Sequence, residues 1–145
     1  MSLCTFATWV SAQNSDTAQF QVKLTVEQGC KITATNDLDF GVIARNTRGD
    51  ASSQSNLDVT CTNGTPYQVK LKGTEMMHNI NQPDQVIPYQ LFQTSNHDTE
   101  WNANVELSAL GTGTTTHLPI YAKLDGETNV ATGQYVDTVT AMLTY

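Results

Sequence analysis

Two strictly alternating segments, one near each end of the chain, constrain the fold more than any other feature. The first spans residues 19–26, and its apolar positions are Phe20, Val22, Leu24 and Val26. The second ends the sequence, and its apolar positions are Val139, Ala141, Leu143 and Tyr145. Alternation with a period of two predicts a β-strand that buries one face and leaves the other wet. Both ends of the chain are therefore predicted to be half-buried strands.

The last strand raises the question of what covers its open side, because no residue follows Tyr145 in this sequence. An edge strand with an apolar face is a pairing liability that a secreted monomer normally blunts or covers. We expect the N-terminal strand of one copy to close the open edge of another. Closure on its own domain remains the alternative, although the short linker at residues 27–29 makes that reach difficult.

Length and charge limit the classes of protein that the chain can belong to. With 145 residues it has room for one domain with its own core. A net charge of -7, without a cluster of basic residues, argues against nucleic-acid binding. Charged residues make up only 14%, and no run of 18 apolar residues occurs, so a membrane span is not expected. This composition is typical of a secreted all-β protein.

The first twelve residues are interpreted as the remnant of a secretory signal. An apolar stretch from Leu3 to Val10 is followed by Ser11 and Ala12, so cleavage is expected before Gln13, although a positively charged start is missing. Export implies an oxidising compartment. Two cysteines, Cys30 and Cys61, remain in the mature chain, which fits one disulfide; two unpaired buried thiols would be the alternative.

Short strands separated by turn residues fill the rest of the sequence, at the spacing of a β-sandwich. The expected strands are residues 30–34, 38–42, 57–61, 67–72, 87–93, 117–124 and 135–145. Several of them bury one face only, so two sheets must pack together. The predicted organisation is a signal remnant at 1–12, an N-terminal strand and linker at 13–29, and a sandwich domain at 30–145.

No constellation of residues predicts catalysis, a cofactor or a metal. The three histidines His78, His97 and His117 lack the spacing of a metal site. Carboxylate groups that could form an acid–base pair, Asp37 with Asp39 or Asp84 with Asp98 and Glu100, more plausibly solvate loops. The chain is therefore not expected to be an enzyme.

Four aromatic residues could line a sugar-binding face, namely Tyr89, Phe92, Trp101 and Tyr121. At strand positions such residues more often belong to the core, which is the interpretation we favour. The Asn63-Gly64-Thr65 sequence matches a glycosylation acceptor, but Asn-Gly is also a strong signal for a tight turn. We expect the turn.

Several segments, in order, resemble the spore coat protein U-like domain, which is the pilin fold of archaic (Csu-type) chaperone-usher pili. They are the alternating strand leading into Gln28-Gly29-Cys30, then Leu38-Asp39-Phe40-Gly41, Val59-Thr60-Cys61, Tyr89-Gln90-Leu91-Phe92 with Trp101, and Gly133 to Val139. Together these segments cover nearly all of the expected mature chain.

The resemblance implies an incomplete immunoglobulin-like sandwich that lacks its last strand and is completed by donor-strand complementation. The donor residues would be Phe20, Val22, Leu24 and Val26. The acceptor groove would be bordered by Val139, Ala141, Leu143 and Tyr145, and the disulfide would join Cys30 to Cys61. Implied partners are other pilin subunits, a periplasmic chaperone and an outer-membrane usher.

The functional expectation is a structural pilin subunit of a cell-surface fimbrium, exported through the periplasm and supporting adhesion and biofilm formation. Two other interpretations remain open at the level of sequence. One is a single-domain adhesive or carbohydrate-binding module. The other is a spore or cyst coat protein, as the family name indicates.

Overall fold

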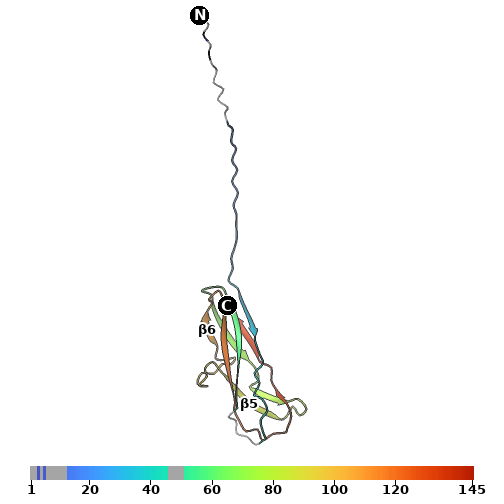
Figure 1. Cartoon of the computed structure of the whole chain (residues 1–145). Coiled ribbons are helices and arrows are strands. Elements are labelled where there is room, and N and C mark those ends of the chain that lie inside the picture. Colours follow the sequence, from blue (N-terminus) through green and yellow to red (C-terminus); the bar gives the residue numbers. More distant parts are fainter. Residues whose placement is uncertain (1–2, 4, 6–12, 46–50) are drawn as a thin grey trace.

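A computed structural model describes residues 3, 5, 13–45 and 51–145, and these residues form an all-β protein (Figure 1). Within the described residues there are nine strands and no helix. The strands are β1 (Cys30–Ala34), β2 (Ser52–Cys61), β3 (Pro66–Lys72), β4 (Met76–Asn79), β5 (Val86–Phe92), β6 (Leu107–Leu110), β7 (Thr115–Leu124), β8 (Tyr135–Val136) and β9 (Thr140–Thr144).

The strands form two antiparallel sheets that pack as a sandwich. One sheet has six strands in the order β1-β2-β7-β5-β4-β8, and the other has three in the order β6-β3-β9. In the part of the chain that the structure describes, β1 pairs only with β2, and β9 pairs only with β3. Each sheet therefore ends in an open edge, and the sandwich is incomplete where β1 and β9 approach each other.

The core lies between the sheets and follows the alternation of the central strands. Its inward side chains include Leu57 and Val59 on β2, Tyr67, Val69 and Leu71 on β3, and Leu118, Ile120, Ala122 and Leu124 on β7, all of them buried. Burying one such large apolar side chain contributes about 1.5 to 3 kcal/mol. Trp101 is fully buried, and its indole Nε1 donates a hydrogen bond to the Val69 carbonyl at 2.9 Å. This bond fastens the segment after β5 to the opposite sheet.

The predicted disulfide is confirmed, because Cys30 and Cys61 are bonded across the β1–β2 pair. The expected turn at residues 63–64 also forms, with Gly64 at a φ of 78°. That left-handed conformation is easily reached by glycine. Both features lie at the same pole of the sandwich, next to the point where the N-terminal segment joins β1 (Figure 1).

Three strand predictions need correction. Residues 38–42 form no strand, because Gly41 has a φ of 78° and its amide bonds back to the Asp39 carboxylate. Residues 135–145 divide into β8 and β9. The sequence-based strand at 57–61 is the end of a longer strand that begins at Ser52, and the short strands β4 and β6 were missed.

The N-terminal segment does not fold onto the sandwich. Every residue from 13 to 29 is exposed, and the segment extends away from the pole where the chain ends (Figure 1). The predicted signal remnant at 1–12 lies outside the described residues, apart from residues 3 and 5.

A candidate strand-acceptor groove

A groove of about 910 Å³ with an apolar floor lies where the sandwich is incomplete. Its floor is formed by core side chains from both sheets, namely Leu57, Leu71, Ile87, Leu91, Ile120, Ala122 and Leu124. Its two walls come from segments far apart in the sequence, the chain at 32–45 on one side and the chain at 128–141 on the other. The groove is therefore an unfilled part of the core.

The first wall continues β1 as an irregular segment along β2. The Ser55 hydroxyl donates to the Asn36 carbonyl at 2.6 Å, and the Ser53 hydroxyl donates to the Asp39 carbonyl at 2.8 Å. These bonds hold the segment where a regular ladder is absent. Leu38 and Phe40 are half-buried against the core, whereas the intervening Asp39 is exposed. The wall thus presents apolar groups inward without being a strand.

The second wall contains a polar contact between β5 and the connection from β8 to β9. The Tyr89 hydroxyl donates to the Asp137 carboxylate at 2.5 Å, and the Thr74 amide donates to the same oxygen at 3.3 Å. Burial, followed by the hydrogen bond and the charge of Asp137, raises the pKa of Tyr89 well above its ordinary value. This contact fixes the connection from β8 to β9 beside the groove.

The two strand edges that flank the groove offer what an extended peptide needs. One side of β1 and one side of β9 carry no strand partner among the described residues. Unpaired backbone amide and carbonyl groups on such edges are templates for another strand. An inserted strand would meet backbone partners at the edges and apolar side chains at the floor, which is the arrangement of β-strand addition.

The structure divides the four predicted acceptor residues into two pairs. Val139 and Ala141 line the groove. Leu143 packs against the core, and Tyr145, which is 60% exposed, lies beside a shallow hollow with Pro66 and Leu110. Sequence reasoning missed the wall at 35–45 and the Tyr89–Asp137 contact. The alternation of Leu38 and Phe40 was the one available signal for that wall.

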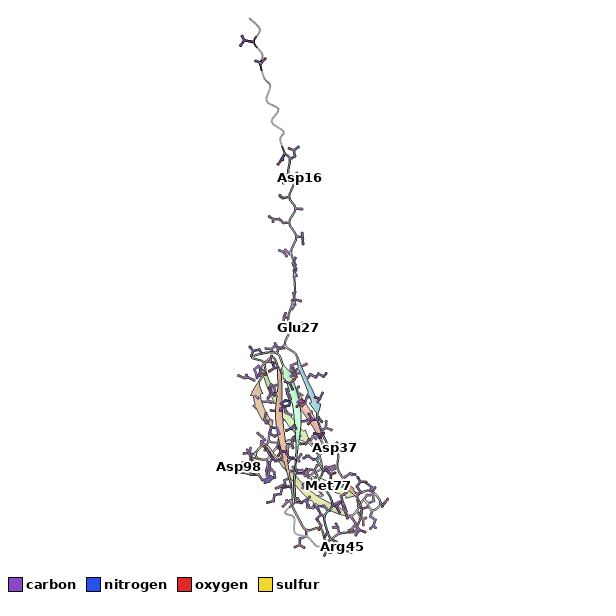
Figure 2. All side chains as sticks on the ribbon, viewed as in Figure 1. Asp16, Glu27, Asp37, Arg45, Met77 and Asp98 are labelled. Atoms are coloured by element: carbon purple, nitrogen blue, oxygen red, sulfur yellow. A yellow bond between two sulfur atoms is a disulfide. The ribbon has the colours of Figure 1, made fainter. Side chains whose placement is uncertain are left out.

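All four predicted donor side chains are solvent-exposed. The exposed fractions are 87% for Phe20, 90% for Val22, 85% for Leu24 and 76% for Val26. They lie on the extended segment outside the sandwich, between Asp16 and Glu27 in Figure 2. The chain therefore displays an extended segment with exposed apolar side chains and a groove with an apolar floor, and the two are not in contact with each other.

The three histidines contact residues that have no part in a metal site. His117 Nδ1 lies 2.5 Å from Asp58 Oδ1, His78 Nδ1 lies 3.0 Å from the Pro83 carbonyl, and the His97 ring packs on Phe92. Within the described ranges, no three His, Cys, Asp or Glu side chains gather as a metal site would require.

The aromatic residues belong mainly to the core, as favoured from the sequence. Tyr89, Phe92 and Trp101 are buried, and Tyr121 is half-buried. Their rings therefore do not form an exposed platform of the kind that a sugar-binding face requires. No helix of the described chain has the length and apolar character needed to cross a membrane.

This chain is an all-β sandwich with an open groove between the edges of β1 and β9. That architecture is the one of an incomplete immunoglobulin-like domain. The chain belongs to the Spore Coat Protein U domain family, whose model matches residues 16–142. That match includes most of the exposed N-terminal segment at residues 13–29. No curated protein sequence matches the chain.

A solved structure shares this fold. One match is a chain of the CsuC–CsuE chaperone–tip adhesion subunit pre-assembly complex from the archaic chaperone-usher Csu pili of Acinetobacter baumannii, with a TM-score of 0.63 and 23% identity. The structural alignment covers 83% of this chain and 41% of the matched chain. A second is a chaperone–tip adhesin complex of CFA/I fimbriae, with a TM-score of 0.49, 15% identity, and coverage of 79% and 42%. The chain thus spans less than half the length of either matched chain.

Proposed function

We propose that this protein is a structural subunit of a secreted chaperone-usher fibre and that it polymerises by inserting its N-terminal strand into the groove of a neighbouring copy or a related subunit. One observation carries the proposal. The same chain presents a groove with an apolar floor between two open strand edges and, outside that groove, an extended segment with four exposed apolar side chains. Membership of the Spore Coat Protein U family supports this function.

The positions of the chain ends give the direction of insertion. The N-terminal segment leaves the sandwich at the pole where β1 begins and where the chain ends (Figure 1). In a head-to-tail fibre the donor domain must sit at the opposite pole of the acceptor. The inserted strand then runs antiparallel to β9 and parallel to β1. It adds to two edges at once.

The energy of such a joint comes mainly from the apolar side chains. Full burial of Phe20, Val22, Leu24 and Val26 would supply about 1.5 to 3 kcal/mol each. Loss of translational freedom and ordering of the strand oppose this gain. Because the backbone of the strand also pairs with both edges, the balance favours a stable joint.

An open apolar groove also calls for protection before assembly, since exposed patches and strand edges promote aggregation. We assign that role to a periplasmic chaperone, and transfer to the next subunit to an outer-membrane usher. The similarity to a chaperone complex of Csu pili supports the first assignment. The fibre would stand on the cell surface, where it would support adhesion and biofilm formation, and the subunit itself would have no catalytic role.

The test compares two neighbouring substitutions in the donor strand. Leu24→Asp would bury a charge in an apolar groove at a cost of several kcal/mol, whereas Lys23→Asp changes the wet face. Cells that produce the full chain with its chaperone and usher should lose heat-resistant ladders on gels with Leu24→Asp and keep them with Lys23→Asp. Equal assembly of both variants would contradict strand insertion and favour a self-contained adhesive module.

A further inference from the structure

The N-terminal segment is fixed at its base by Thr62, the residue that directly follows β2. The Gly29 amide donates to the Thr62 hydroxyl at 3.0 Å, and the same hydroxyl donates to the Gly29 carbonyl at 3.3 Å. The Thr62 amide also donates to the Gly29 carbonyl at 2.9 Å. We call these three bonds the Gly29–Thr62 clamp. It extends the β1–β2 ladder by one residue pair beyond Cys30 and Cys61.

The linker next to the clamp could form a tight turn. Residues 27–29 would make a three-residue hairpin loop with glycine in the third position, where such loops place a left-handed residue. This loop would set Val26 opposite Cys30 and Leu24 opposite Ile32. Cross-strand partners point to the same face, and Cys30 and Ile32 both pack against the core. The donor strand would then fill the groove of its own domain with the correct face inward.

The clamp keeps Gly29 out of that turn. Gly29 is absent from the residues with positive φ, and both of its backbone polar groups bond to Thr62. A left-handed Gly29 would turn these groups away from Thr62. An added Cβ at Gly29 would meet no atom within 4 Å, so the present conformation does not itself require glycine.

We propose that Gly29 and Thr62 are positioning residues that decide which strand fills the groove. The intact clamp directs the donor strand outward, which keeps it available to another copy. Its loss lets residues 27–29 turn, and the chain then closes on itself as a monomer that cannot extend a fibre. This inference rests on the proposed function, because it concerns the same strand and the same groove.

The test uses the full mature chain, unfolded with its disulfide intact and refolded at high dilution. Trypsin cleavage after Lys23, followed by mass spectrometry, reports whether the strand is exposed or inserted. Thr62→Val removes the two bonds of the hydroxyl and should raise the ratio of trypsin-protected to cleaved monomer roughly tenfold, on the basis of two neutral hydrogen bonds. Protection must be independent of concentration, since insertion between copies disappears on dilution.

Gly29→Val is the matched control. A β-branched residue fits the extended conformation but strongly disfavours positive φ, so the protected monomer should fall below the parent level while ladders still form. Adding Leu24→Asp to Thr62→Val should abolish protection. The inferred closed monomer should also resist heat better than the open chain. If the Thr62 hydroxyl only stabilised the fold, its removal would instead lower heat stability.

Two results would overturn the inference. One is a Thr62→Val protein whose ratio of trypsin-protected to cleaved monomer equals that of the parent, or whose N-terminal segment is cleaved while its heat stability falls. The other is a Gly29→Val protein that closes on itself as readily as the parent. Failure of the proposed function has a different signature, because Leu24→Asp would then leave ladder formation unchanged whatever Thr62→Val does to the monomer.

Discussion

The sandwich and the N-terminal segment share one sequence pattern but have opposite surroundings. On β3, Tyr67, Val69 and Leu71 alternate with polar residues and are at most 2% exposed. On the N-terminal segment, Phe20, Val22, Leu24 and Val26 alternate in the same way and are at least 76% exposed. A period of two therefore predicts which face of a strand can be buried. It does not say whether that face packs against the same domain or against another chain.

This difference separates a part of the molecule that is already packed from a part that, in the proposed function, is packed only against a neighbouring subunit. The floor of the groove is already packed on one side, since Leu57, Leu71 and Ile120 belong to the core. The N-terminal strand has no comparable packing. Three changes should therefore have separable effects on solubility and stability, from the largest to the smallest. They are removal of the N-terminal segment, loss of the disulfide in the sandwich, and loss of one hydrogen bond in a groove wall.

The largest effect is expected from removal of residues 13–27. The shortened chain keeps the open groove and its strand edges and should aggregate when produced alone. A synthetic peptide of residues 15–28 should restore a soluble monomer because it binds only the folded state. At one thousand times its Kd it would add about 4.1 kcal/mol of stability, which raises Tm by roughly 15 °C. Light scattering and thermal unfolding measure both quantities.

The control for this prediction is the same peptide with Val22 and Leu24 changed to Asp, which should neither dissolve nor stabilise the shortened chain. A shortened chain that is monomeric, stable and indifferent to the peptide would show that the sandwich is complete without a donor. The contrast between the two regions would then have no functional meaning.

A smaller effect is expected from loss of the Cys30–Cys61 disulfide, whose sequence separation is 31. Replacing both cysteines by Ala should lower the free energy of unfolding by about 3 to 4 kcal/mol in the chain-entropy model. Urea unfolding of the chaperone-free, peptide-filled domain measures the loss. Denatured but unreduced mature protein should show no thiols from these two residues, and two reactive thiols would contradict the bond.

The smallest effect is expected at the groove wall. Tyr89→Phe removes the hydrogen bond to Asp137 and should cost about 1.5 to 3 kcal/mol, the range for bonds to a charged group. Because the folded-state pKa of Tyr89 is raised, its contribution is fully present below the unfolded value of 10.0 and is lost as pH rises through the folded pKa.

Urea midpoints at neutral and strongly alkaline pH check this wall. The parent should lose stability on the alkaline side, and the Tyr89→Phe variant should lose less over the same interval. Peptide affinity should fall in the variant as well, since Asp137 fixes the connection to β9. An identical alkaline loss in both proteins would assign the pH dependence to another group, such as buried Tyr67, whose pKa burial also raises.

The sequence predicted several strands well because their alternation coincides with burial. The expected strands at 30–34 and 67–72 match β1 and, within one residue, β3. The disulfide followed from the cysteine count, and Trp101 was correctly favoured as a core residue, although it lies outside the strands, between β5 and β6. These features depend on local pattern and composition, which a single sequence contains.

The groove walls were less predictable because side-chain hydrogen bonds shape them. Residues 38–42 alternate like a strand, yet this wall is held to β2 by the hydroxyls of Ser53 and Ser55, which donate to the carbonyls of Asp39 and Asn36. The break between β8 and β9 depends on Tyr89 and Thr74 bonding to Asp137, residues 48 and 63 positions away. Contacts at such separations leave no periodic signal in the sequence.

The disulfide also sets the path of mechanical load through a fibre of the proposed kind. Tension from one neighbour reaches β1 through Gly29, at the residue pair where Cys30 is covalently joined to Cys61. The pull therefore passes at once from the edge strand into β2, which pairs with β7 over nine residue pairs from Ser52 to Thr60. An edge strand that would otherwise peel away one hydrogen bond at a time is loaded together with the centre of the sheet.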